Sequence, residues 1–254
     1  MNIHDNAILA GEPSCVLLDL DNTLYHYDPA HKAGTDAVRA FAESQLKISG
    51  PNFDRCFEDA RTETKRRLGA TASGHNRLLY FQRTIEKAGL ATQSFAALQM
   101  EQAYWSAFLA AAPTFPEALE FLDDLRIAGI PTIIITDLTA QIQHRKMLYF
   151  GLNRYVDWMV TSEEAGADKP DPRIFQLALA KIGGVEGPVW MVGDNPACDL
   201  AGARKALGCF TIQKTHDGVR PGRQGDEKPH ASFGAFSEIR KMLRDLLDRR
   251  DATS

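Results

Sequence analysis

Cys15-Val16-Leu17-Leu18-Asp19-Leu20-Asp21-Asn22-Thr23-Leu24 is the most informative stretch of this chain. An apolar run of strand length delivers two carboxylates, at positions 19 and 21, and then a hydroxyl into the loop that follows. Because residues two apart point to the same side of a strand, the two aspartates converge where the chain leaves the strand end. Paired carboxylates are costly there unless a cation or a shared proton relieves their repulsion. We therefore interpret Asp19 and Asp21 as a catalytic, metal-dependent pair.

The composition is that of an ordinary globular protein. The chain has 254 residues, 44% hydrophobic and 24% charged, a length that fits one large domain or one domain with an insert. A net charge of −4 gives no support for nucleic-acid or membrane-surface binding. The first residues lack the basic start and apolar stretch of a leader, and no apolar run approaches the ~20 residues of a membrane helix. We expect a cytoplasmic protein with no nucleic-acid or membrane partner.

Strands and helices alternate from residue 116 onward. Apolar runs of strand length follow the first one, at 131–136, 156–160, 189–192 and 209–212. Helical apolar spacing occurs at 116–128, 139–150, 172–182, 198–207 and 237–250. Nearly continuous apolar strands that alternate with helices indicate an α/β protein with a parallel sheet covered on both faces.

The interval before residue 112 has a different pattern. No second strand is evident in it, and helical spacing recurs at about 32–47, 53–69, 76–88 and 93–110. Its aromatic residues, from Phe95 with Leu98 to Phe108, are typical of the core of a small helical bundle. We therefore expect two domains, a discontinuous α/β core (1–27 plus 112–254) and an inserted helical domain (28–111).

Polar side chains follow four of the predicted strands. Ligands bind outside the carboxyl ends of the strands in an open parallel sheet. Taken singly, each of these residues is equally compatible with a turn or a helix cap. Because each lies at a strand exit, together they predict one site, formed by Asp19, Asp21, Thr136, Asp137, Lys169, Asp194 and Asp199.

These residues resemble the four ordered motifs of the haloacid dehalogenase (HAD) superfamily. The motifs are DLDNT at 19–23, Thr136, Lys169 and GDNPACD at 193–199, and the connecting segment VTSEEAGADKPDPRIFQLAL is also similar. The resemblance covers residues 15–27 and 112–213. It implies a Rossmann-like parallel sheet, and the inserted helices resemble the type 1 cap of this superfamily.

The resemblance implies a role for each motif residue. Asp19 would attack phosphorus and become an aspartyl phosphate, and Asp21 would act as the acid and base. Mg²⁺ would bind the Asp19 carboxylate, the Asp21 backbone carbonyl and Asp194, with Asp199 orienting a ligand.

Thr136 and Lys169 would hold and neutralise the phosphoryl group. Asn22 is a further candidate for substrate binding. Asp137 stands where many relatives have Asn-Gly. Its carboxylate either borders the phosphate or caps the helix that begins near Thr139, and we favour the cap.

The insert offers one polar cluster, Ser73-Gly74-His75-Asn76-Arg77. One interpretation is that Ser73 or Asn76 caps the following helix. The other is that His75 or Arg77 reaches the leaving group of an anionic substrate. His26 and His31 are further candidates for lining the entrance.

The function that we predict is a magnesium-dependent phosphomonoester hydrolase acting on a small phosphorylated metabolite, such as a nucleotide or sugar phosphate. A 2-haloacid dehalogenase is the first alternative, but those relatives lack an acid at the position of Asp21. A sugar phosphomutase shares the core chemistry, and a phosphonatase would need a lysine in the cap. A non-catalytic HAD-fold binding protein would be expected to lack one of the charged motif residues, and all of them are present.

Overall fold

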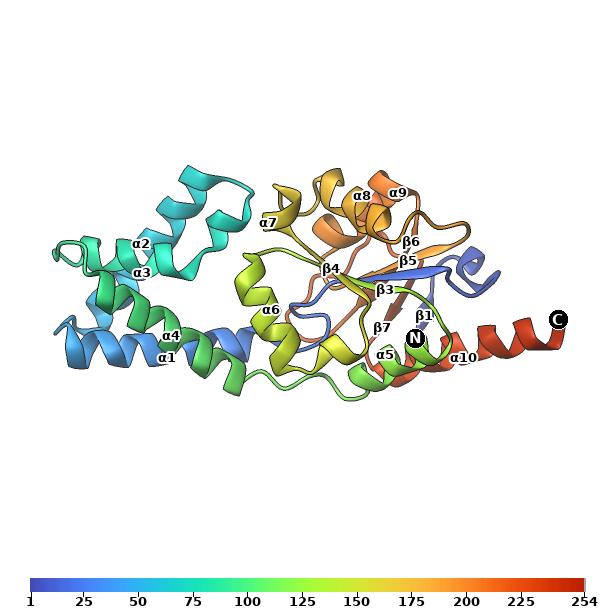
Figure 1. Ribbon diagram of the computed structural model, residues 1–254, viewed down its shortest axis with the longest axis horizontal. Helices are drawn as coiled ribbons and strands as arrows, with labels where there is room; N and C mark the ends of the chain where they lie inside the picture. Colours follow the sequence, from blue (N-terminus) through green and yellow to red (C-terminus); the bar gives the residue numbers. More distant parts are fainter. Residues whose placement is uncertain (254) are drawn as a thin grey trace. The chain divides into compact units, whose positions relative to one another are not determined.

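The computed structural model describes residues 1–253, and the chain divides into two compact units (Figure 1). The α/β unit consists of Met1–Tyr25 together with the chain from Thr114 onward. The helical unit is His26–Pro113. Among the described residues, no helix has both the length and the apolarity that a membrane span requires.

One seven-stranded sheet forms the centre of the α/β unit, in the order β1-β7-β6-β5-β2-β3-β4. Neighbouring strands are parallel except for the β1–β7 pair. The strands are β1 (Asn2–Ile3), β2 (Cys15–Leu18), β3 (Thr132–Thr136), β4 (Trp158–Thr161), β5 (Val189–Gly193), β6 (Phe210–Lys214) and β7 (Ala231–Phe233). The five longer strands were predicted, whereas β1 and β7 are too short to show any periodicity.

Helices cover both faces of this sheet. In Figure 1, α8 and α9 lie on one face, and α5 and α10 lie on the other. The helices are α5 (Ala118–Ile127), α6 (Ala140–Tyr149), α7 (Ser162–Ala165), α8 (Pro172–Lys181), α9 (Gly202–Leu207) and α10 (Phe236–Thr253), and a π-helical turn, η4 (Pro196–Ala201), precedes α9. Three short 3₁₀ turns are η1 (Asn6–Leu9), η3 (Leu152–Arg154) and η5 (Gly225–Glu227).

Every residue of β2 is buried, which explains its unbroken apolar sequence. Its Cys15 and Leu17 belong to one core cluster with Ile133 of β3, Met191 of β5 and Phe175 of α8. Two covered faces leave no polar position within the strand, so polar side chains begin only where the strand ends. The predicted α/β class with a parallel, Rossmann-like sheet is confirmed.

The register of the strands gathers their ends at one edge. Leu18 pairs with Ile134 on β3 and with Val192 on β5. The backbone N–H of Asp19 still donates to the Val192 carbonyl, over 2.9 Å. Asp19 therefore emerges between the ends of β3 and β5, which carry Thr136 and, one residue beyond β5, Asp194.

The helical unit is built from α1 (Tyr27–Gln45), α2 (Gly50–Leu68), η2 (Ala72–His75), α3 (Arg77–Lys87) and α4 (Ser94–Ala110). Buried aromatic rings, including Phe53, Phe81 and Phe108, fill its core. The expectation that Phe95 and Leu98 join them was wrong, since their exposed fractions are 77% and 55%. Both lie in the first turns of α4, where apolar spacing alone does not show which residues are covered.

The chain leaves and re-enters the α/β unit at paired residues. Tyr25 forms isolated β-bridges with Asp21 and with Thr114, and the N–H of Phe115 donates to the Leu24 carbonyl over 2.9 Å. The two ends of the helical insertion are thus held side by side next to the loop that follows β2.

Candidate active site

Asp19 and Lys169 form a buried ion pair at the end of β2. Lys169 Nζ lies 2.6 Å from Asp19 Oδ1, and the Thr23 hydroxyl donates to Asp19 Oδ2 over 2.8 Å. Lys169 Nζ also lies 2.7 Å from Asp199 Oδ1 and 3.2 Å from the Ile135 carbonyl. Both partners are almost fully enclosed, with exposed fractions of 5% for Asp19 and 6% for Lys169. Residues distant in the sequence therefore meet here, as predicted.

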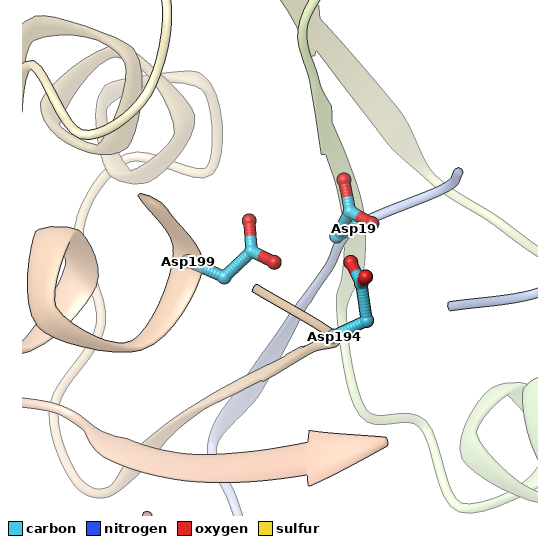
Figure 2. A group of neighbouring side chains, drawn as sticks. All are labelled: Asp19, Asp194 and Asp199. Carbon is cyan, nitrogen blue, oxygen red and sulfur yellow. The ribbon is translucent and has the colours of Figure 1, made fainter. Parts of the chain in front are cut away.

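Three carboxylates converge beside this pair. Figure 2 shows Asp19, Asp194 and Asp199 directed toward a common space, and one oxygen of each lies within 4.8 Å of the others. Asp199 comes from η4, and its Oδ2 accepts from the N–H of Asn195 over 2.9 Å. The chain thus brings together the three aspartates predicted to ligate or support a metal.

The electrostatics of this cluster are those of excess negative charge. Burial raises the pKa of Asp19 to about 7, although Lys169 opposes the shift. Burial, together with Asp19 and Asp199, raises the pKa of Asp194 to about 8. Burial alone would lower the pKa of Lys169, but Asp19 and Asp199 raise it well above its usual value. One ammonium does not compensate three carboxylates, so an oxygen-preferring divalent cation fits this donor set.

Asp21 lies outside this cluster and contacts a second lysine. Lys146 Nζ, on α6, donates to Asp21 Oδ1 over 2.7 Å and to Oδ2 over 2.8 Å, and the Tyr25 hydroxyl also donates to Oδ1. The Lys146 side chain is fully buried and that of Asp21 is 30% exposed. The carboxylate therefore has a fixed orientation while one side of it remains open to solvent.

Thr136 ends β3 and is oriented by a buried glutamine. Gln143 Nε2, on α6, donates to Thr136 Oγ1 over 2.6 Å and to the Asp137 carbonyl over 2.6 Å. Because Thr136 Oγ1 accepts from Gln143, its own hydroxyl proton remains to be donated. The hydroxyl donates only weakly within the protein, to the Asp137 carbonyl, with 3.4 Å between the two oxygens.

Asp137 does not cap α6, so this expectation was wrong. Its Oδ1 accepts from the backbone N–H of Lys169 over 2.9 Å, and Glu163 Oε2 accepts from Ala140 in the first turn of α6 over 2.7 Å. Between Asp137 and α6 lies Leu138, whose φ of 122° is in a region that residues with a side chain rarely adopt. Ser162 Oγ stabilises this strained turn by accepting from the Leu138 N–H. Asp137 therefore positions the Lys169 loop.

Asn22 also has an unusual backbone conformation, with φ of 63° in the left-handed region. His216 Nε2, from the loop after β6, lies 3.1 Å from the Asn22 carbonyl. This contact holds the turn in which the chain reverses after Asp21. A role of the Asn22 side chain in substrate binding stays a prediction.

His75 and Arg77 lie in the helical unit. Asn76 caps α3 by accepting from the Leu79 N–H over 3.3 Å, which confirms one of the two capping candidates. The Arg77 guanidinium donates to the Tyr27 hydroxyl and to the His75 carbonyl, and it is buried. It lies 5.4 to 5.7 Å from the ring centroids of Tyr80, Tyr104 and Trp105. Contact of His75 or Arg77 with substrate stays a prediction.

Sequence reasoning missed Gln143, Lys146 and Tyr25. A signal for the first two was present, because Gln143 and Lys146 are three residues apart and share the buried face of α6 with Ile142 and Met147. Two polar residues at helical spacing among apolar ones indicate buried partners.

Comparisons with known proteins agree with this geometry. A family model described as haloacid dehalogenase-like hydrolase matches residues 13–206. The chain is 40% identical over 200 residues to a ribulose-1,5-bisphosphate 5-phosphatase of Halopiger xanaduensis, and the aligned stretch covers 78% of this chain and 83% of that protein. It is also 30% identical over 214 residues to a phosphoserine phosphatase of Thermus thermophilus, with an aligned stretch that covers 75% of this chain and 84% of that protein.

Solved structures share the fold. A 2-haloacid dehalogenase from Pseudomonas syringae matches with a TM-score of 0.69 at 24% identity, over 92% of this chain and 99% of that one. A HAD phosphatase from Thermococcus onnurineus matches with a TM-score of 0.63 at 22% identity, over 90% and 97%. The predicted superfamily and the predicted phosphatase type of hydrolase are confirmed by the family model and the sequence relatives. The chain belongs to the haloacid dehalogenase-like hydrolases.

Proposed function

We propose that this phosphatase is a magnesium-dependent phosphomonoesterase that acts on a small phosphorylated metabolite through an aspartyl-phosphate intermediate. The observation that carries the proposal is the buried Asp19 carboxylate, bonded to Lys169 and next to Asp194 and Asp199. A carboxylate held at a strand end by a lysine and a threonine has the position and fixed orientation that a nucleophile needs.

The reaction divides into two displacements. In the first, an Asp19 oxygen bonds to phosphorus, the bond from phosphorus to the ester oxygen breaks, and Asp21 gives that oxygen its proton. In the second, Asp21 takes a proton from water as the water oxygen bonds to phosphorus, and the bond from phosphorus to the Asp19 oxygen breaks. Inorganic phosphate leaves, and the Asp19 carboxylate and protonated Asp21 are restored.

The remaining residues orient and neutralise the phosphoryl group. Thr136 donates its hydroxyl proton to a phosphoryl oxygen, as its acceptance from Gln143 favours. Lys169 supplies a compact positive charge at the nucleophile. Asn22, in the loop after β2, is a further candidate for contact with the phosphoryl group. Phosphoryl transfer depends mainly on positioning and charge stabilisation, which these residues provide.

Asp19, Asp194 and the backbone carbonyl of Asp21 would hold Mg²⁺, and Asp199 would orient one of its ligands. When bound, this ion supplies positive charge that offsets the crowded carboxylates and the phosphoryl oxygens. Magnesium usually keeps several waters, so few protein ligands suffice.

Selection of the leaving group is assigned to the helical unit, with His75 and Arg77 as the first candidates. The relative that is 40% identical is named for a sugar bisphosphate. We therefore place sugar phosphates first among the substrates to be tested, ahead of phosphoserine and nucleoside monophosphates.

A screen of phosphorylated metabolites, with released phosphate as the readout, tests this proposal. Wild-type protein is assayed with magnesium and after chelation, beside the Asp19→Asn variant. We expect phosphate release from at least one ester that requires both the metal and Asp19. A second arm measures halide release from 2-haloacids. Halide release without phosphate release, or phosphate release unaffected by Asp19→Asn, would contradict the proposal.

A further inference from the structure

Lys146 is a cation that the mechanism described so far does not use. It lies on α6 between Arg145 and Met147, and its side chain is fully buried. Lysine is rarely fully buried unless its charge is paired. The partner is Asp21, which accepts from Lys146 Nζ with both carboxylate oxygens, over 2.7 and 2.8 Å.

Tyr25 completes the surroundings of this carboxylate. Its ring is fully buried and packs against that of Phe150 in a tilted arrangement, with 4.8 Å between the ring centroids, and its hydroxyl donates to Asp21 Oδ1. Two buried donors on packed elements therefore fix both torsions of a short side chain. Such an arrangement holds a catalytic group more precisely than a surface loop could alone.

The two oxygens of Asp21 are not equivalent. Oδ1 accepts from both Lys146 and Tyr25, whereas Oδ2 accepts from Lys146. A carboxylate oxygen has two lone-pair sites, so two donors occupy those of Oδ1 and one site remains on Oδ2. Oδ2 is therefore the oxygen with room to pass a proton to or from a reacting group.

We propose that Lys146, together with Tyr25, is a positioning residue that aims Oδ2 of Asp21 at the ester oxygen. This inference rests on the proposed function, in which Asp21 is the acid and base. It adds that Lys146 of α6 serves proton transfer, and not metal or phosphoryl binding. A misplacement of about 1 Å can cost roughly a hundredfold in rate, so the supporting residues matter even without touching substrate.

The test compares two phosphate esters whose leaving groups differ in their need for a proton from Asp21. An alkyl phosphate expels a strongly basic oxygen and requires the proton, whereas p-nitrophenyl phosphate expels a stable phenolate and does not. Lys146→Met should lower kcat/KM for an alkyl phosphate, which reports the first displacement, by roughly tenfold to a hundredfold, which is less than the ~10²–10⁴-fold expected from removal of the acid itself. The value of kcat/KM for p-nitrophenyl phosphate should change little, because its first displacement needs no acid.

A double variant separates positioning from a general structural effect. If Lys146 acts through Asp21, adding Lys146→Met to Asp21→Asn should cause little further loss. Tyr25→Phe, which removes one hydroxyl and keeps the ion pair, should give a smaller change of the same selectivity. This variant keeps the proposal testable if Lys146→Met does not fold.

Lys214→Met is the matched control. Lys214 is also buried, but its Nζ donates to the carbonyls of Thr215 and Gly234. It should leave the ratio of alkyl to aryl rates unchanged. Equal losses for both esters in Lys146→Met, or additive losses in the double variant, would overturn the inference alone. An inactive wild-type enzyme would instead overturn the proposed function and the inference with it.

Discussion

Lys169 of the α/β unit and Arg77 of the helical unit are both buried cations, but their charges are compensated differently. In the α/β unit, Lys169 contacts the carboxylates of Asp19 and Asp199 at 2.6 and 2.7 Å. In the helical unit, Arg77 contacts a tyrosine hydroxyl, a carbonyl and three aromatic rings. Among the described residues of that unit, no ion pair joins Arg77 to a carboxylate.

This difference teaches what each unit is suited to. In the α/β unit the Lys169 ammonium is paired directly with two carboxylates. The guanidinium of the helical unit keeps its net charge, because rings and hydroxyls stabilise a cation without neutralising it. An anionic ligand would supply the missing partner. The predictions below test whether the α/β unit carries the chemistry and the helical unit the selectivity.

The largest effect is expected for Asp19→Asn. An amide has nearly the shape of a carboxylate but is a far poorer nucleophile, so turnover of every ester should be abolished while the fold is retained. Circular dichroism checks the fold, and phosphate release checks turnover. Mass spectrometry of wild-type protein trapped with beryllofluoride should locate the adduct on Asp19. Substantial turnover by the variant would rule out the covalent route.

Asp21→Asn should lower kcat by ~10²–10⁴-fold, as is typical when a general acid and base is removed. Its metal affinity should be retained, because the proposed ligand at this position is the backbone carbonyl. Magnesium titration followed by calorimetry, beside steady-state kinetics, separates the two properties. A collapse of metal affinity without a separate loss in rate would show that the side chain itself holds the ion.

Removing Lys169 from the α/β unit and Arg77 from the helical unit compares the two units directly. In metal-free protein, Lys169→Met leaves two buried carboxylates without their partner and should lower the free energy of unfolding by about 3–5 kcal/mol. Arg77→Met loses neutral hydrogen bonds and contacts with rings and should cost about 1–2 kcal/mol. Urea denaturation of both variants checks the difference. Equal costs would mean that the two cations are compensated alike.

The raised pKa values of Asp19 and Asp194, about 7 and about 8, give a pH dependence with a definite sign. Below these values the folded state holds protons that the unfolded state has already released. Metal-free protein should therefore become more stable as the pH falls from 9 to 5, by about 1.4 kcal/mol per pH unit for each such proton.

Thermal melts along that pH series measure the effect, with saturating magnesium as a second series. Magnesium competes with the protons, so the gain on acidification should shrink when it is present. Asp194→Asn removes one of the two groups and should flatten the metal-free series. A metal-free series that is most stable at pH 9 would contradict the crowding described for these carboxylates.

The smallest effect concerns the helical unit. His75→Ala and Arg77→Ala should lower kcat/KM for the best substrate by about tenfold, the typical cost of one charge-assisted hydrogen bond. For p-nitrophenyl phosphate the loss should be much smaller. Arg83→Ala is the matched control, because Arg83 lies on the same helix but pairs with Glu63 and Glu86. Equal losses for both esters would leave Arg77 as a purely structural residue.

The sequence predicted the strand-end residues because parallel topology makes their position almost unavoidable. Asp19, Thr136 and Asp194 each end an apolar run, or follow one directly, and parallel strands align these ends at one edge. The position of Lys169 was harder to predict from the strand pattern, since both α7 and a loop separate it from β4. Its motif, and not its periodicity, identified it.

The partners of these residues were not predictable in the same way. Asp137 bonds to the N–H of Lys169, and that choice depends on the strained φ of Leu138, which no local pattern reveals. Lys146 and Gln143 are polar residues in an amphipathic helix, where polar positions are usually solvated. Only the packing of α6 shows that their side chains point toward the loops after β2 and β3.

Tyr25 and Thr114 form a β-bridge, which the hydrogen bond from the Phe115 N–H to the Leu24 carbonyl reinforces. This pairing affects how freely the inserted segment can be exchanged. The segment 26–113 begins and ends at one paired point, so its length does not affect the spacing of β2 and β3. Lengthening an inserted segment costs little closure entropy, about 0.6 kcal/mol for each doubling. A different insert can therefore replace this segment while the strands of the sheet keep their register. A shortened chain in which a tight turn joins Tyr25 to Thr114 should therefore keep the register of β2 and β3.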